Sequence, residues 1–404
     1  MNASVRLEHT LLAAEAEHEL NAMVEIAIPD APGDESRPPL RLALVLDRSG
    51  SMAGEKLEVA KRCAAWLVSR LRPQDELALV DYDDNVRLLA PLAPVSQAPL
   101  RAAISSIWPG GSTNLSGGWL KGLEQLRGDR GKILILTDGL ANVGITDEHA
   151  LVELARRAGA ERVGTSTIGF GHDFAEELLT QMADAGGGNA HYAETPDAAP
   201  AIFADELEGL TSVVAQNVSL EIRPQEHVEV LGILNEYPHL ALAGGVQVQL
   251  GDGYGGERRR IVFSLQVPRL AELGPVHLAD LVLRYVSVGD EIAHHELTIP
   301  VTANAVSAAE AAGIAPDGEV QEEVLLLKAA QAREQAIRLA DAGEFDAAQR
   351  VSRETAKGLR LAGMDTAAEA LEADAPVLSA PLYSAAERKR MWFAQHQTRR
   401  RRSS

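Results

Sequence analysis

The sequence predicts an α/β unit that is inserted in an antiparallel β-sandwich-like domain and followed by a C-terminal helical hairpin. From about Pro39 to Ala215, short apolar runs alternate with longer amphipathic stretches, which is typical of parallel strands with crossover helices. From Val218 to Val301, apolar and polar residues alternate between frequent turns, as in an antiparallel sheet. Residues 321–373 are rich in Ala, Leu, Glu, Gln and Arg, which favours helices.

Length and composition indicate a protein of two or three compact units. The chain has 404 residues, of which 46% are hydrophobic and 24% are charged, and no apolar run is long enough to cross a bilayer. The formal net charge of −20 excludes general nucleic-acid binding, which needs a concentrated basic surface. The N-terminus lacks the basic start, apolar stretch and cleavage site of a secretory signal, so we expect a cytoplasmic protein.

The β-sandwich-like domain is expected to be split by the α/β unit. The stretch from Val5 to Ile28 alternates in the same way as the segment after residue 218, so it is predicted to pair into the same sheet. The expected units are N-terminal sandwich strands in 1–37, the α/β unit in 38–215, the remaining sandwich in 216–305, a helical hairpin in 306–374, and a linker with a basic tail in 375–404.

Within the α/β unit, strands and helices are expected to alternate. The expected strands are Leu40–Leu46, Glu76–Tyr82, Val86–Leu89, Lys132–Leu136, Val163–Ile168 and Ala190–Ala193. The expected helices are Glu55–Leu71, Pro99–Ile107, Ser116–Leu126, Glu148–Ala158, Phe174–Ala183 and Ala198–Val214. The run from Leu42 to Leu46 is apolar on both faces, as a central parallel strand must be, and it places Asp47 at the carboxyl end of a buried strand.

The C-terminal part has a helical and a basic segment. Gly343 interrupts the helical stretch and Asp346 can cap the helix that follows, which predicts a hairpin. The segment Glu387–Ser404 concentrates basic residues on an otherwise acidic chain. A solvated tail or an intramolecular contact is favoured over a nucleic-acid patch, because such short basic runs are weak signals.

Polar residues follow two of the expected buried strands. The sequence Asp47-Arg48-Ser49-Gly50-Ser51 comes after the first strand, and Asp138 comes after Ile133–Leu136. Ligands of open parallel sheets bind beyond the carboxyl ends of the strands. The glycine-rich loop Gly110–Leu115 can bring the Thr113 hydroxyl to the same edge.

The two aspartates, the two serines and Thr113 all offer hard oxygen atoms, which suit Mg²⁺, with Mn²⁺ or Ca²⁺ as alternatives. Singly, each would be interpreted as a helix cap or turn residue. Together they predict a metal site, called the five-residue site below, made of Asp47, Ser49, Ser51, Thr113 and Asp138. Two carboxylates, either of which can act through a water molecule, and three neutral hydroxyls leave the ion with residual positive charge, so an outside carboxylate is a favoured further ligand.

This pattern resembles the metal-ion-dependent adhesion site (MIDAS) of von Willebrand factor type A (VWA) domains. The resemblance covers roughly residues 38–215 and rests on Asp47-x-Ser49-x-Ser51, Thr113 and Thr137-Asp138-Gly139 in that order. It implies a Rossmann-like fold, hydroxyl ligation by Ser49, Ser51 and Thr113, and direct or water-mediated ligation by Asp47 and Asp138. The order of the flanking segments resembles bacterial stand-alone members.

The resemblance also implies how the site is used. The remaining coordination position belongs to an Asp or Glu of a partner protein, which predicts a non-enzymatic, metal-dependent protein-binding module. In the same resemblance, Asp81, Asp83 and Asp84 are turn residues between two strands.

Two other functions remain open. Carboxylates at the ends of parallel strands also suit a metal-dependent phosphoester hydrolase, although the loops lack a residue suited to act as general acid. The helical hairpin and basic tail suit a scaffold subunit of an ATPase-containing assembly. The segment Gly251–Gly256 matches a dinucleotide fingerprint by letters but precedes a strand, so we expect a hairpin turn there.

Overall fold

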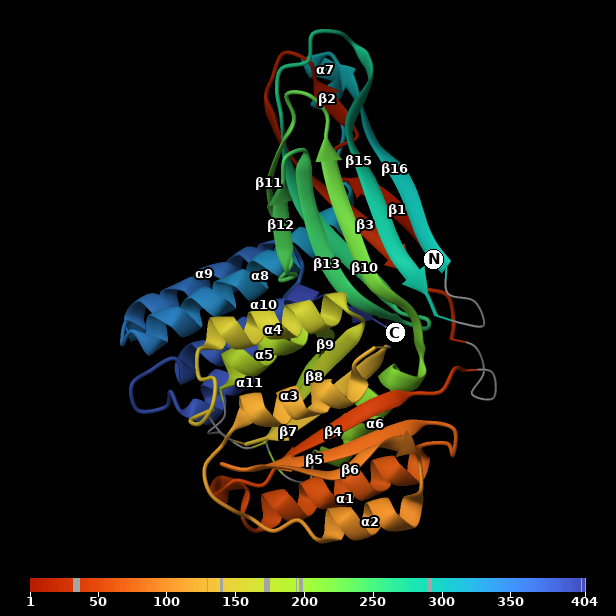
Figure 1. The fold of residues 1–404 in the computed structure, drawn as a ribbon. Coiled ribbons are helices and arrows are strands. Elements are labelled where there is room, and N and C mark those ends of the chain that lie inside the picture. Colours follow the sequence, from red (N-terminus) through yellow and green to blue (C-terminus); the bar gives the residue numbers. More distant parts are fainter. Residues whose placement is uncertain are drawn as a thin grey trace.

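The computed structural model describes residues 1–31, 37–128, 130–138, 141–170, 175–193, 195, 199–288 and 293–400, and the backbone of 402–403. It has three parts, an α/β unit, a two-sheet sandwich above it and a group of C-terminal helices beside the place where they meet (Figure 1). The predicted fold class is confirmed. In the part of the chain that is described, no helix is both long and apolar enough to span a membrane.

The α/β unit is built on a mixed sheet with the strand order β6-β5-β4-β7-β8-β9, in which only the β5–β6 pair is antiparallel. Its strands are β4 (Arg41–Asp47), β5 (Glu76–Tyr82), β6 (Val86–Pro94), β7 (Gly131–Thr137), β8 (Val163–Phe170) and β9 (Gly187–Ala193). Its helices are α1 (Glu55–Arg70), α2 (Gln97–Ser105), α3 (Leu115–Leu126), α4 (Glu148–Ala160), α5 (Glu176–Ala185) and α6 (Ala199–Thr211).

Both faces of this sheet are covered by helices, as the apolar run in β4 predicts. Leu42, Leu44 and Leu46 pack with α1, α2 and α6, whereas Ala43 and Val45 pack with α3, α4 and α5. The period-2 alternation of strand side chains explains this division. Helix α6 is shorter than expected because Val213 and Val214 already belong to strand β10.

The sandwich contains one sheet of order β1-β3-β14-β11 and a second of order β12-β13-β10-β15-β16-β2. The N-terminal strands pair far along the chain, β3 with β14 and β2 with β16, so the α/β unit is an insertion in a split β domain. The bounds are β1 (Asn2–Leu7), β2 (Leu11–Ala13), β3 (His18–Ala27), β10 (Val213–Pro224), β11 (Glu229–Ile233), β12 (His239–Leu242), β13 (Gly245–Tyr254), β14 (Arg258–Val267), β15 (Gly274–Ser287) and β16 (Ala293–Val306).

The predicted hairpin turn in Gly251–Gly256 is wrong. The segment ends β13 and leads to β14, but β13 pairs with β10 and β12, whereas β14 pairs with β3 and β11. The chain therefore crosses from one sheet to the other here. Gly255 suits the crossing, because a Cβ at this position would lie 2.3 Å from the backbone nitrogen of Ala31.

The C-terminal region holds more helices than the predicted hairpin. It contains α7 (Ala308–Ala311), α8 (Gly318–Asp341), α9 (Phe345–Leu361), α10 (Asp365–Val377) and α11 (Ala385–Arg400). The turn at Gly343, with φ +80°, separates α8 from α9 as expected, and Gly363, with φ +77°, separates α9 from α10. Ser403 and Arg402 form a short strand, β17 (Arg402–Ser403), against β14.

The basic segment is helix α11 rather than a solvated tail, so the predicted intramolecular contact is the correct alternative. Arg388 forms ion pairs with Glu176, Glu177 and Asp341, and Lys389 pairs with Glu176 at 2.6 Å. Further along the helix, Met391, Trp392 and Phe393 join the core beneath α4 and α5. The basic charges therefore fix the C-terminal helix to the α/β unit.

Candidate metal site

Asp47 is held at the carboxyl ends of two neighbouring strands. It is the last residue of β4 and is fully buried. Its Oδ1 accepts the backbone N–H of Ser49 at 2.7 Å, and its Oδ2 accepts the hydroxyl of Thr137, the last residue of β7, at 2.5 Å. The first bond bends the chain into the short 3₁₀ turn Gly50–Met52, from which α1 starts.

Two serines connect this loop to Asp138. The Ser49 and Ser51 hydroxyl oxygens are 3.2 Å apart, and the Ser51 hydroxyl donates to Asp138 Oδ1 at 2.8 Å. Asp138 is fully buried, whereas Ser51 is exposed, so the chain of oxygens runs from the interior to the surface. On the other side, the Lys56 ammonium donates to Asp138 Oδ2 from the first turn of α1. Four members of the five-residue site are thus brought together.

Thr113 lies in a loop that is attached to the same edge. The Gly50 N–H donates to the Gly111 carbonyl at 2.8 Å, and the Gly110 N–H donates to the Arg48 carbonyl at 2.7 Å. The buried Thr113 donates its own N–H to Asn142 Oδ1 at 2.8 Å. Among the described residues, however, the Thr113 hydroxyl makes no hydrogen bond with the other four members.

Asp83 anchors the glycine loop. It pairs with Arg48 at 2.8 Å and accepts the Gly111 N–H at 3.0 Å. A Cβ at Gly110 would lie 1.9 Å from an Asp83 carboxylate oxygen, so any larger residue here would displace the Asp83–Arg48 ion pair. Asp83 also accepts the Asn85 N–H at 2.7 Å, as a turn residue does. The prediction that Asp81 lies in the turn is wrong, because Asp81 belongs to β5 and pairs with Arg87.

The charges of the site leave room for a cation. The pKa of Asp47 is raised to about 6, mainly because the carboxyl group is buried and partly because the Asp138 charge lies nearby. Hydrogen bonds from Thr137 and Ser49 act in the opposite direction but do not cancel the rise. Lys56 pairs with Asp138, while no basic side chain in the described ranges pairs with Asp47. Two carboxylates and the serine and threonine hydroxyl oxygens are ligands that Mg²⁺ accepts, so the residues present fit a divalent ion.

The described residues contain no cluster of three or more His, Cys, Asp or Glu side chains arranged to hold a metal. The five-residue site has only two carboxylates and depends on hydroxyl oxygens for the rest, so it is a different type of site. Bound there, Mg²⁺ would be held by the two carboxylates and the hydroxyls and would supply an electrophilic position for an outside carboxylate.

Sequence reasoning missed Lys56, Asn142 and the role of Thr137. Thr137 could have been found, because it is the strand-end residue next to Asp138 and faces the same edge as Asp47. Lys56 carried a weaker signal as a lysine in the first turn of α1, where acidic residues are usual. Asn142 carried none, because its contact with Thr113 depends on how the loop after β7 returns.

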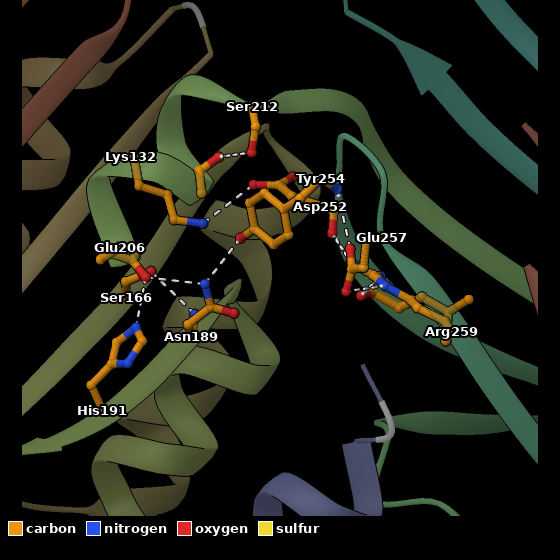
Figure 2. A network of polar contacts seen from close by, with 12 residues as sticks. Lys132, Ser166, Asn189, His191, Glu206, Ser212, Asp252, Tyr254, Glu257 and Arg259 are labelled. Atoms are coloured by element: carbon orange, nitrogen blue, oxygen red, sulfur yellow. Dashed lines mark hydrogen bonds and ion pairs between the residues drawn. The ribbon is translucent and has the colours of Figure 1, made fainter. Parts of the chain in front are cut away.

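A second polar cluster lies near the amino end of β7, where the sheet of the α/β unit meets the sandwich (Figure 2). This junction cluster consists of Lys132, Asn189, His191, Glu206, Asp252 and Tyr254. The Lys132 ammonium lies 3.2 Å from Asp252 of β13. Glu206 of α6 accepts from Asn189 at 3.0 Å and contacts His191 at 2.8 Å.

The junction cluster supplies its own counter-charges. Burial alone would raise the pKa of Glu206, but the His191 hydrogen bond and the charges of His191 and Lys132 lower it to about 2. Asn189 also donates to the Tyr254 hydroxyl at 3.3 Å, which connects strand β9 to strand β13. The cluster thereby fixes α6 and the sheet to the sandwich, which is a structural role.

Comparison with known proteins identifies relatives of the α/β unit. Residues 42–205 match the family described as "von Willebrand factor type A domain". Uncharacterized protein YfbK of Escherichia coli is 32% identical over 196 residues, which cover 46% of this chain and 34% of that protein. Uncharacterized protein sll0103 of Synechocystis is 28% identical over 250 residues, 58% of this chain and 59% of that protein. The chain thus spans about a third and about three fifths of the lengths of these relatives.

Solved structures extend the likeness to nearly the whole chain. A von Willebrand factor type A protein from Catenulispora acidiphila has a TM-score of 0.72 at 16% identity, covering 91% of this chain and 88% of that one. The ArnB paralog VWA2 from Sulfolobus acidocaldarius has a TM-score of 0.66 at 19% identity, covering 99% and 98%. At these identities the likeness concerns the fold alone. Residues 42–205 thus match the VWA domain family, and the chain is similar to proteins of bacteria.

Proposed function

We propose that this protein is a non-enzymatic, metal-dependent protein-binding module of the MIDAS type. A divalent cation at the five-residue site, Mg²⁺ in the first place and Mn²⁺ or Ca²⁺ as alternatives, captures an Asp or Glu of a partner protein. The domain supports this proposal at the coarser level, because VWA domains are typically adhesion or protein-binding modules.

The observation that carries the proposal is the hydrogen-bonded series that joins Asp47 through Ser49 and Ser51 to Asp138. Both carboxylates are buried, whereas the Ser51 between them is exposed, so an ion held there faces the surface. The backbone hydrogen bonds of Gly50 and Gly110 fix the surrounding loops before any ligand arrives. Such a preformed site lowers the ordering cost of binding.

Binding is favoured over catalysis by the partners of the hydroxyl groups. Ser51 donates to Asp138, and Ser49 contacts Ser51, so neither is paired with a base in the manner of a nucleophile. In the described ranges, no histidine contacts either serine. We therefore propose that the protein is not an enzyme. We also propose that it acts in the cytoplasm.

A random peptide display library, selected on the immobilised full chain in Mg²⁺ and eluted with EDTA, tests the function. The proposal predicts that the eluted pool is enriched in Asp and Glu, and that Ser49→Ala/Ser51→Ala loses this enrichment. An EDTA-eluted pool without acidic residues, or one that the double variant retains, contradicts the proposal. Circular dichroism of the variant shows whether it is folded.

A further inference from the structure

Trp108 is an exposed tryptophan beside the five-residue site. Its exposed fraction is 72%, whereas Trp119 is fully buried and Trp392 is 8% exposed. It lies between the end of α2 and the glycine loop that carries Thr113. Tryptophan is among the residues most enriched at interface positions that dominate binding energy. An exposed tryptophan on a binding face therefore marks a contact point.

The backbone around Trp108 is bound to the loops of the site. The Arg48 guanidinium donates to the Trp108 carbonyl at 3.5 Å, and the Gly110 N–H donates to the Arg48 carbonyl at 2.7 Å. Lys61 of α1 donates to the Ile107 carbonyl at 3.3 Å, and its ammonium lies 5.8 Å from the centre of the Trp108 ring. The ring is thus mounted on a fixed segment, so little ordering is needed when it binds.

The loop that joins Trp108 to Thr113 is exposed and polar around its glycines. Gly110 and Gly111 are exposed, and carboxylate oxygens of Asp83 and Asp84 lie within 2.0 Å of where a Cβ on each glycine would be. The Trp108 ring therefore adds an apolar contact at the edge of a polar surface.

The length of the loop limits the distance between the ring and the site. Thr113 follows Trp108 by five residues, so their Cα atoms lie at most about 18 Å apart. An extended partner segment of about five residues spans that distance.

From these observations we infer that Trp108 is the second contact of the binding face and sets its specificity. The partner is a protein segment in which an Asp or Glu is accompanied, within about five residues, by a large apolar side chain that packs on the Trp108 ring. This inference rests on the proposed function, because the metal-bound end of the segment is the acidic residue.

The test uses a peptide display library with a fixed central Asp and random flanks, selected on the full chain in Mg²⁺ and eluted with EDTA. Wild type is expected to enrich Trp, Phe, Leu or Met within five positions of the Asp. The Trp108→Ala variant keeps an EDTA-eluted pool but loses this apolar enrichment. Leu361→Ala removes an 82% exposed leucine at the end of α9 and should behave as wild type.

The best peptide from wild type, resynthesised, is expected to bind Trp108→Ala about tenfold more weakly or worse, and Leu361→Ala unchanged. Equal enrichment by wild type and Trp108→Ala overturns the inference, as does an Asp-dependent wild-type pool without apolar residues; in both cases the proposed function stands. If wild type gives no EDTA-eluted pool, the proposed function fails and the inference fails with it. A fall in the sedimentation coefficient of the unliganded chain on Trp108→Ala would instead assign the ring to self-association.

Discussion

A buried charged side chain lies near each end of strand β7, and the two side chains differ in the charges that surround them. Near its amino end, Lys132 lies in the junction cluster, where Asp252, Glu206 and His191 come from the same chain. Just beyond its carboxyl end, Asp138 shares the five-residue site with Asp47. Six residues of extended strand, about 20 Å, separate the two.

The comparison shows which cluster is complete without a ligand. In the junction cluster the carboxylate Glu206 has its pKa lowered to about 2 by neighbouring hydrogen bonds and positive charges, despite its burial. In the five-residue site, burial and the Asp138 charge raise the pKa of Asp47 to about 6. One cluster supplies enough positive charge for its acids and serves the fold, whereas the other has a buried carboxylate, Asp47, that is available to the divalent ion we propose.

The largest effect is expected in the junction cluster. Lys132→Met removes the buried ammonium that pairs with Asp252 and that adds to the His191 charge beside Glu206, and removing one partner of a buried ion pair costs about 3–5 kcal/mol. The urea unfolding midpoint should fall accordingly, with or without Mg²⁺. Lys121→Met, which breaks the exposed pair with Glu124, should change stability by less than about 1 kcal/mol. If Mg²⁺ restored the unfolding midpoint of Lys132→Met, the junction cluster could not be a purely structural cluster that is separate from the metal site.

The acid sensitivity of the junction cluster comes next. The pKa of Glu206 is lowered from 4.5 to about 2 in the folded chain, so its contribution to stability is present above pH 4.5 and is lost as pH falls towards 2. The loss amounts to as much as about 3 kcal/mol. The difference in urea midpoint between wild type and Glu206→Gln, measured from pH 6 to pH 3, should shrink at the acid end. A constant difference over this range would contradict the expected protonation.

A smaller effect is expected from Lys56. Its ammonium occupies one oxygen of Asp138 and repels a divalent ion, so Lys56→Met should bind Mg²⁺ about tenfold more tightly. Titration calorimetry measures the Mg²⁺ affinity. The matched variant Lys61→Met should change this affinity only slightly relative to wild type. Weaker binding by Lys56→Met would mean that the lysine positions Asp138 for the metal.

The smallest expected effect belongs to Thr113. Its hydroxyl is one neutral ligand and makes no bond with the other four members within the described structure, so Thr113→Ala should weaken Mg²⁺ binding by about 1 kcal/mol. Thr113→Ser should restore it. If Thr113→Ala binds Mg²⁺ as wild type does, the site has four protein ligands rather than five.

The sequence allowed most of the α/β unit to be predicted, because local periodicity carries that information. Strands β4 and β5 and helices α1 and α3 lie within one residue of their expected bounds. The same reasoning placed the acidic and hydroxyl residues that follow β4 and β7 at one edge of the sheet. The point where each buried apolar run ends marks the carboxyl end of its strand, and these ends lie at the same edge.

The exact partners of distant segments could not be predicted, although the split of the β domain could. The basic residues of α11 have the composition of a solvated tail, and their partners Glu176 and Asp184 lie some 200 residues earlier in the chain. The alternation in the N-terminal stretch predicted that it joins the sandwich, but not that β14 pairs with β3, which makes Gly251–Gly256 a sheet crossing. The family resemblance assigned Asp81 to a turn together with Asp83 and Asp84, yet Asp81 lies inside the strand and pairs with Arg87.

The most direct measurement is calorimetric titration of Mg²⁺ into the full chain and into Asp47→Asn, with Asp84→Asn as the control. Asp84 is exposed, lies near the glycine loop and is not a member of the five-residue site. Wild type and Asp84→Asn should bind one Mg²⁺ per chain, and Asp47→Asn should show no binding while its circular dichroism spectrum is unchanged. Equal Mg²⁺ binding by wild type and Asp47→Asn would contradict the metal site.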